Sequence, residues 1–154
     1  MELSSILKPE AVRVFSAASS KKRLFQEIGE LASSALGMNA QATVEALMER
    51  ESLGPTGVGN GVALPHARMP GLEQVSAVFV MLEKPIDFGS VDRQPIDIAF
   101  ALFAPEEAGV EHLKALALVS RTLRVPAVCA KLRANLNPGT LYAILTEPQA
   151  VQAA

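Results

Sequence analysis

Two apolar runs in the middle of the chain limit its fold more than any other feature. The segments VSAVFVML (75–82) and IDIAFALF (96–103) are almost continuously apolar and rich in Val, Ile and Phe. A strand with this pattern is buried on both faces, so helices must cover both sides of the sheet that contains it. A shorter run, VALP (62–65), is a third candidate strand, and the connection 83–95 carries turn residues with room for a brief edge strand.

Five segments carry apolar residues at the three- and four-residue spacing of amphipathic helices. Ser20 is suited to cap the first helix, Gly37 to end it and Asn39 to cap the second. Pro126 and Pro138 suit the first turns of the last two helices. We therefore expect helices at 21–36, 40–52, 111–123, 126–134 and 139–146.

The order of these elements predicts an α/β fold, with a single three-layer domain over residues 1–154. Periodicity alone leaves the strand order open. The tail after Glu147 is small and polar, and we expect it to be frayed. In the third helix, the residues expected to face inward are Leu113, Leu116, Ala117 and Leu123.

The composition excludes several classes of protein. The chain has 154 residues, 49% of them apolar, and no apolar run approaches the roughly 20 residues that span a bilayer. A formal net charge of -2 leaves no basic footprint for nucleic acid. The single cysteine, Cys129, is expected in the core, and the N-terminus lacks the pattern of a signal peptide. We therefore expect a cytoplasmic protein without membrane insertion.

The stretch TGVGNGVALPHARMP, which starts at residue 56, places one of the two histidines after three alternating glycines. Because the unperturbed pKa of histidine is about 6.5, His66 can serve as a nucleophile, a proton carrier or a metal ligand. Pro65 stiffens the backbone before it, and the glycine backbone lets another molecule approach or binds an anion through free N–H groups. We expect His66 at a strand end facing an open surface. The alternatives are a hydrogen-bonded core histidine and a tight glycine turn.

Three further side chains are candidates for the same site. His112 lies in the first turn of the helix 111–123, where the N-terminus favours anions and a histidine can donate to a phosphoryl group; the alternative is an exposed helix residue. Arg50 ends the helix 40–52 and can clamp a phosphate near the glycine loop, or simply be a solvated cation at the helix C-terminus. Arg68 can act in the same way as Arg50.

Several familiar motifs are absent from the chain. The glycines do not match the G-x-G-x-x-G of dinucleotide-binding loops, and no Walker A sequence is present. The histidines, the cysteine and the acidic residues lack the spacing of zinc sites, and the G-x-S-x-G motif of hydrolases is also missing. We therefore expect neither a metal nor another cofactor.

Taken together, these stretches resemble a known family. TGVGNGVALPHAR is similar to the active-site segment of the IIA proteins of the bacterial phosphotransferase system, of the mannitol/fructose type. LEKPIDFGSVDRQPIDIAFALFAP, EHLKALALVSRTL, LSSILKPEAV and SSKKRLFQEIGELAS resemble the nitrogen-regulatory branch of that family. The likeness extends over residues 3–146 and implies a mixed β-sheet sandwiched by helices.

The resemblance also implies a phosphoryl-transfer site. His66 matches the histidine that accepts a phosphoryl group from a histidine phosphocarrier protein. His112 matches the second histidine, which supports the phosphoryl group, and Arg50 matches the arginine before the glycine loop. The group that fixes the tautomer of His66 is not evident from the sequence.

The resemblance assigns the glycine loop to binding of the phosphoryl group or of a partner. The matching residues are Gly57, Gly59, Asn60 and Gly61. The sequence departs from the family pattern at Ala67, where members often have glycine; the methyl group can narrow the approach to His66.

The family hypothesis is a phosphoryl-transfer protein, not a turnover enzyme, that regulates partners such as potassium transporters or sensor kinases in nitrogen metabolism and potassium homeostasis. One alternative is a sugar-specific IIA component that passes phosphate to a IIB protein. Another is a small-molecule binding module that uses the glycine loop for an anion. A transient partner interface needs an apolar rim, for which Val58, Val62 and Met69 are candidates, with core burial as an equal alternative.

Overall fold

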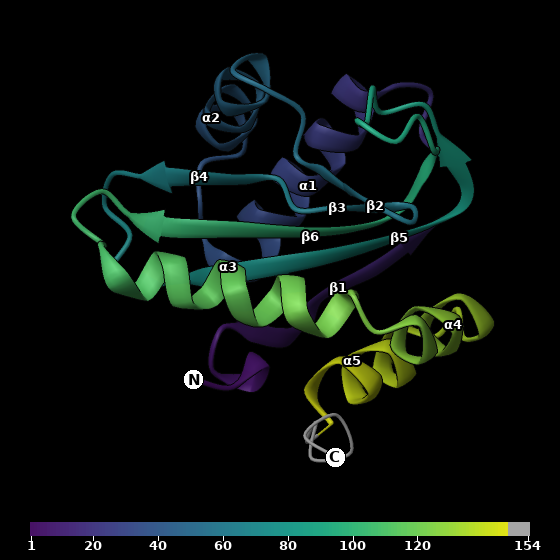
Figure 1. The fold of residues 1–154 in the computed structure, drawn as a ribbon. Helices are drawn as coiled ribbons and strands as arrows, with labels where there is room; N and C mark the ends of the chain where they lie inside the picture. The colour runs from purple at the N-terminus through teal and green to yellow at the C-terminus, as the bar shows by residue number, and fades with distance from the viewer. Residues whose placement is uncertain (148–154) are drawn as a thin grey trace.

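The computed structural model describes residues 1–147, so the predicted frayed tail after Glu147 lies outside the described residues. The described residues form a six-stranded sheet in the order β1-β5-β6-β3-β2, with β4 also paired to β6 (Figure 1). Parallel and antiparallel pairs are both present, which confirms the mixed sheet implied by the family resemblance. The strands are β1 (Leu7–Phe15), β2 (Gly57–Gly59), β3 (Val62–Ala63), β4 (His66–Met69), β5 (Ser76–Ile86) and β6 (Ile96–Pro105).

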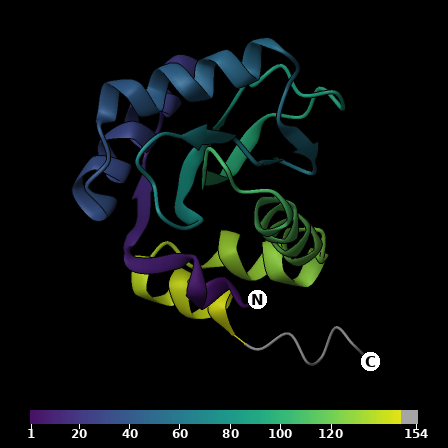
Figure 2. The same cartoon turned by 90° about the vertical axis from the view of Figure 1, so that its left-hand side faces the viewer.

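Helices cover both faces of this sheet. Figures 1 and 2 show α1 and α2 on one side and α3, α4 and α5 on the other, so the three-layer prediction is confirmed. Each predicted helix is present, with its start within one residue of the expected position. No helix in the described part of the chain is long and apolar enough to cross a membrane. The helices are α1 (Lys21–Leu36), α2 (Ala40–Ser52), α3 (Val110–Leu123), α4 (Pro126–Ala134) and α5 (Pro138–Thr146), with a short 3-10 helix at Leu3–Ser5.

The antiparallel pair β5–β6 lies at the centre of the core. Every residue in 77–82 and in 98–104 is buried, so both strands are covered on both faces as predicted. The rings of Phe79 and Phe100 meet edge to face across the pair, with centroids 6.0 Å apart. Cys129 is also buried, which confirms its prediction as a core residue.

Two strand predictions need correction. The edge strand β1 was not expected, because Pro9 and the charged residues around it obscure its apolar pattern; an edge strand tolerates proline because one side of its backbone is unpaired. The predicted brief edge strand within 83–95 is absent from the described structure. Instead, β5 runs on to Ile86, and turns lead from there to β6.

The inward face of α3 also differs from the prediction. Leu113 is 66% exposed and Ala117 is exposed as well, although both were expected to face inward. The sequence assignment treated His112 as polar surface, whereas it is buried and begins the inward face one position earlier. The buried residues of α3 are His112, Ala115, Val119, Thr122 and Leu123.

The glycine-rich stretch forms a β-hairpin. Gly59 pairs with Val62, so Asn60 and Gly61 are the two loop residues. Their φ angles are 57° and 78°, and two successive positive φ angles are what a type I′ hairpin turn requires. The Asn-Gly pair is a known sequence signal for this turn, and it was not used in the sequence analysis.

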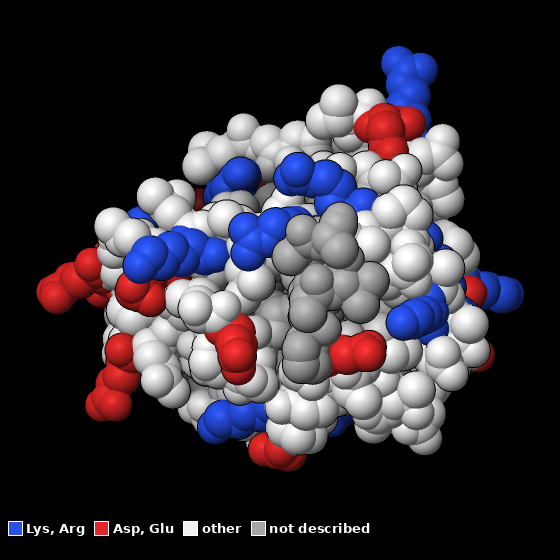
Figure 3. Space-filling model, turned by 60° about the horizontal axis from the view of Figure 1, so that its bottom comes forward, with Lys and Arg blue, Asp and Glu red and all other residues white. Residues whose placement is uncertain are grey.

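The charges are distributed without one dominant sign on the face that Figure 3 shows. Lys and Arg side chains form short groups there, separated by uncharged and acidic residues.

We expect the substitution Gly61→Ala to destabilise the protein more than Gly71→Ala does. Both glycines have a positive φ, of 78° and 80°. A Cβ atom on Gly61 would lie 2.6 Å from a guanidinium nitrogen of Arg133, whereas nothing lies within 4 Å of one on Gly71. The free energy of unfolding, measured with urea, should fall by about 1 kcal/mol for Gly71→Ala and by about 2 kcal/mol or more for Gly61→Ala. Equal losses would contradict the close approach of Arg133.

Candidate functional site

His66 is the first residue of β4, a short strand at the sheet edge. The strands β3 and β4 both pair in parallel with β6, at Val62↔Ile98 and His66↔Leu102, and so form one strand with a break between them. The break includes Pro65, which has no N–H to donate, although its carbonyl accepts a hydrogen bond from the Leu102 amide at 2.9 Å. His66 was predicted at a strand end, and it lies instead at the start of β4. The strand β4 itself lies between α2 and α3 (Figure 1).

The backbone fixes the tautomer of His66. Its Nδ1 lies 2.8 Å from the carbonyl oxygen of Leu64. A carbonyl can only accept a hydrogen bond, so Nδ1 carries the proton and the Nε2 lone pair is free. The sequence did not reveal this acceptor, because the carbonyl of Leu64 can reach the ring of His66 only where the strand is broken.

His112 lies against His66. The two ring centroids are 5.6 Å apart with the planes at 70°, although 46 residues separate them in the sequence. His112 is buried, so it is not the exposed helix residue that the spacing alone favoured. Its Nε2 atom is buried without a hydrogen-bond partner among residues 1–147. Such groups are rare in folded proteins and often have a functional role.

The two histidines border a surface cavity of about 480 Å³. Arg50 also lines it and donates a hydrogen bond of 3.0 Å to the Gly54 carbonyl, which holds the guanidinium at the end of α2. The structure therefore brings together His66, His112 and Arg50, as the resemblance implied. The lining residues are Ala46, Glu49, Arg50, Leu53, His66, Ala67, Arg68 and His112.

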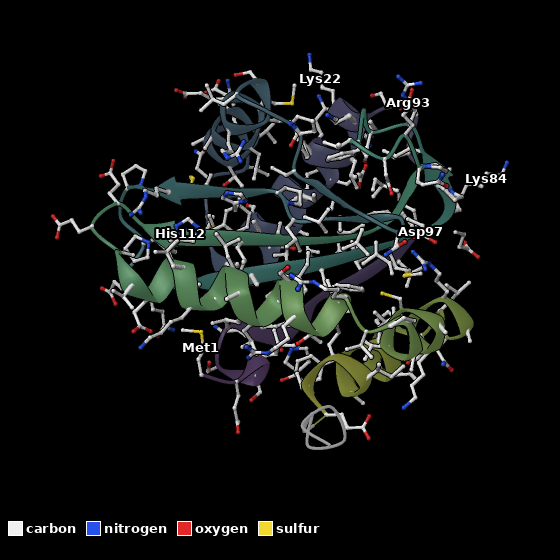
Figure 4. All side chains as sticks on the ribbon, in the orientation of Figure 1. Met1, Lys22, Lys84, Arg93, Asp97 and His112 are labelled. Atoms are coloured by element: carbon white, nitrogen blue, oxygen red, sulfur yellow. The ribbon has the colours of Figure 1, made fainter. Side chains whose placement is uncertain are left out.

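The glycine hairpin does not line this cavity. Gly61 precedes His66 by five residues of nearly extended chain, which places them roughly 16 Å apart. The hairpin turn borders a different cavity, where Arg133 donates to the Asn60 carbonyl at 2.6 Å and pairs with Asp97. Figure 4 shows Asp97 and His112 at opposite ends of the sheet.

The distance between the glycine hairpin and His66 argues against the phosphoryl-binding role expected for this loop. Gly59, Asn60 and Gly61 form a tight turn and are not positioned to hold a group on His66. Gly57 packs beside Ser90, where an added Cβ would lie 2.9 Å from the Ser90 Cβ. The alternative of a tight turn therefore describes the loop better than a phosphoryl cradle does.

The apolar residues around the cavity differ from those expected. Val62 and Met69 belong to the core, whereas Val58, on the glycine hairpin, is 55% exposed. The exposed apolar side chains near the histidines are instead Leu53, which lines the cavity, and Val110 and Leu113 in the first turn of α3.

Glu51 is a residue whose structural role the sequence analysis missed. Its buried carboxylate accepts hydrogen bonds from the Thr56 amide and hydroxyl, at 3.1 and 2.6 Å, and from the Lys21 ammonium at 2.8 Å. These bonds tie the ends of α1 and α2 to the chain that leads toward His66. A sequence feature could have revealed this role: Glu51 lies in the last turn of α2, where the helix dipole disfavours a carboxylate that has no partner.

Burial keeps both histidines uncharged at neutral pH. It is the main cause that lowers the pKa of His66, with a smaller contribution from the charge of Arg50; the Leu64 hydrogen bond and Glu51 act in the opposite direction. Burial also lowers the pKa of His112, with the charges of His66 and Arg68 adding to it. No group of three or more metal-ligating side chains occurs within the described residues.

The lowered pKa values predict how the histidines titrate. In the folded protein, the titration midpoints of both histidines, followed by the NMR signals of their C2 protons, should lie below pH 6.5, the value expected for the unfolded chain. The unfolded chain then binds more protons just below pH 6.5, so the free energy of unfolding decreases as the pH falls through this range. His66→Asn should move the His112 midpoint upward, because the charge of His66 contributes to lowering it. Midpoints at or above 6.5 would contradict the burial argument.

The Glu51 contacts predict a loss of stability on substitution. Glu51→Gln replaces the buried carboxylate, which accepts three hydrogen bonds, with an uncharged amide. It should lower the free energy of unfolding by about 2–3 kcal/mol. Glu111→Gln is the matched control, because its 3.7 Å pair with Lys114 is exposed and should change stability by less than about 0.5 kcal/mol. Similar effects in urea unfolding would refute the role of the buried network.

Comparisons with known proteins identify the family and agree with this fold. The family model described as "Phosphoenolpyruvate-dependent sugar phosphotransferase system, EIIA 2" matches residues 5–147. A nitrogen regulatory protein of Bradyrhizobium diazoefficiens is 43% identical over 153 residues, covering 99% of this chain and 100% of that protein. The crystal structure of the nitrogen regulatory protein IIA-Ntr from Neisseria meningitidis has a TM-score of 0.85 and 33% identity, covering 94% of this chain and 99% of that chain.

A third comparison concerns the fold alone. IIA mannitol from Escherichia coli has a TM-score of 0.72 at 19% identity, covering 90% of this chain and 97% of that chain. The family match spans almost the whole described chain, and the Bradyrhizobium diazoefficiens relative, matched over its whole length, is named a nitrogen regulatory protein. The chain therefore belongs to the EIIA type 2 family of the phosphoenolpyruvate-dependent sugar phosphotransferase system, and within that family it is similar to the nitrogen regulatory proteins.

Proposed function

We propose that this chain is a cytoplasmic phosphocarrier that accepts a phosphoryl group on His66 and regulates partner proteins by its phosphorylation state. The donor is a phosphohistidine on a small phosphocarrier protein. The observation that carries the proposal is the hydrogen bond from His66 Nδ1 to the Leu64 carbonyl, beside a cavity that also contains His112 and Arg50. It leaves Nε2 as the nucleophilic nitrogen.

The transfer forms one N–P bond and breaks another. The Nε2 lone pair of neutral His66 attacks the phosphorus, and the electron pair of the donor's N–P bond returns to the donor imidazole. The ring of His66 gains positive character, which the Nδ1–H bond to the Leu64 carbonyl stabilises. Phosphoryl transfer needs mainly positioning and charge stabilisation, and the side chains around His66 are of the kind that supply both.

Two neighbouring groups are suited to stabilise the transferred phosphoryl group. Arg50 provides a permanent positive charge at the cavity wall. His112 has a buried Nε2 atom without a partner among the described residues, and a phosphoryl oxygen beside it would give it one. We assign both residues to support of the phosphoryl group on His66.

The exposed apolar residues suit the docking of a donor. Leu53, Val110 and Leu113 are 81%, 62% and 66% exposed. Leu53 directly follows α2 and the other two belong to α3, and these are the two helices next to β4 (Figure 1). A transient interface combines such an apolar centre with a polar rim. Phosphorylation adds about -1.5 to -2 charges at this surface. A regulated partner that binds here can therefore distinguish the two forms; potassium transporters and sensor kinases are candidates from the family resemblance.

The proposal predicts one acid-labile phosphoryl group per chain. The protein is incubated with phosphoenolpyruvate, the first enzyme of the phosphotransferase system and a histidine phosphocarrier protein, and its intact mass is measured. The wild-type protein and Gly61→Ala should gain the mass of one phosphoryl group, because the hairpin lies away from the cavity. His66→Ala should gain none.

The outcomes separate the hypotheses. Phosphorylation of His66→Ala would refute the assignment, as would no gain by the wild-type protein when a control IIA protein is phosphorylated. Fast onward transfer to a IIB protein would favour the sugar-transport alternative over a regulatory role.

A further inference from the structure

Arg68 is a charged residue at the site to which the proposed transfer gives no role. It lies two residues after His66 on β4, so the two side chains leave the same face of the strand, while Ala67 between them is buried. Arg68 also lines the cavity that contains both histidines. Its position alone would suit a second cation for the phosphoryl group, but its contacts indicate another role.

The guanidinium of Arg68 is bonded to the turn that precedes α3. Its Nη1 atom donates to the carbonyl oxygen of Glu106 at 3.1 Å and also to that of Ala108. Both carbonyls belong to the segment between β6 and α3, almost 40 residues further along the chain. A single side chain of the strand that carries His66 therefore holds the turn that leads into the helix of His112.

Among the described residues, no side chain caps the start of α3. Its N-cap residue is Gly109, which has no side chain to cap the helix and adopts φ -102° and ψ -92°, outside the extended conformation of ordinary N-caps. The turn itself is closed by a hydrogen bond of 3.0 Å from the Ala108 amide to the Pro105 carbonyl. His112 follows three residues after Gly109, so a shift of this turn would move its ring relative to His66.

We infer that Arg68 is a positioning residue, which holds the N-terminus of α3 so that His112 stays against the ring of His66. The inference has two parts. The structural part, that Arg68 fixes the first turn of α3, is independent of the reaction. The functional part, that phosphoryl transfer depends on Arg68 through His112, rests on the proposed function.

The first experiment tests the structural part without any phosphoryl donor. Amide hydrogen exchange is measured for residues 113–116, whose N–H groups bond to carbonyls of the first helical turn. Arg68→Met removes both hydrogen bonds and should accelerate this exchange about tenfold. Arg121→Met is the matched control, because it makes the same change in the last turn of α3 and should leave residues 113–116 unchanged. Unchanged exchange in Arg68→Met would overturn the inference.

The second experiment is a double-mutant cycle on the rate of phosphoryl transfer. Arg68→Met should slow transfer about tenfold in the wild-type background and should have little further effect when His112→Ala is present. The same tenfold loss in both backgrounds would overturn the functional part, because Arg68 would then act on the phosphoryl group directly. A rise in KM for the donor without a change in kcat would overturn it too, since that indicates donor docking.

The two experiments also separate this inference from the proposed function. If the wild-type protein accepts no phosphoryl group, the proposed function fails, and the exchange rates still decide whether Arg68 holds α3. If transfer slows in Arg68→Met while exchange at residues 113–116 is unchanged, the proposed function stands and the positioning role fails.

Discussion

Burial of the β5–β6 pair on both faces is the constraint on which the rest of the structure depends. Neither strand has a polar face, so the sheet requires a helical layer on each side. At one edge of the sheet, β4 lies between α2 of one layer and α3 of the other (Figure 1). A side chain at that edge can contact residues from both layers. His66 does so, because it lies beside His112 from one layer and shares a cavity with Arg50 from the other.

The break between β3 and β4 converts this edge into a site with defined chemistry. In an unbroken strand the carbonyl of Leu64 would point toward a neighbouring strand in the plane of the sheet, away from the side chain of His66. Pro65 has no N–H for a ladder, and at the break the Leu64 carbonyl accepts the Nδ1–H of His66 instead. Pro65 thus accompanies the break in the strand. The break directs the Leu64 carbonyl to Nδ1 of His66, which selects one tautomer and leaves Nε2 free.

The sequence predicted the helices and the central strands well, because their signals are local. The side chains of Ser20 and Asn39 accept hydrogen bonds from the first turns of their helices, as predicted. The almost continuous apolar sequences of β5 and β6 predicted their burial on both faces. Local patterns could not predict the contacts between residues that are distant in the sequence; only the family resemblance implied that such residues share a site. His112 reaches His66 only because of how α3 packs, and its polarity led to an inward face shifted by one position. The glycines were placed near His66 because they are close in sequence, but extended chain carries the Asn-Gly turn to the other end of the sheet.

The electrostatics of the site suit both states of the proposed reaction. Before transfer, burial keeps both imidazoles uncharged, so Nε2 of His66 retains the lone pair needed for attack. After transfer, a group with about two negative charges beside His112 would raise the pKa of that ring, since a nearby opposite charge favours the protonated form. His112 would then become a stronger hydrogen-bond donor at the moment when the phosphoryl group needs one. A lysine in its place would carry its charge in both states, and would oppose the positive character that His66 acquires during attack. A second histidine can change its charge with the reaction, provided that its ring is held in contact with the first.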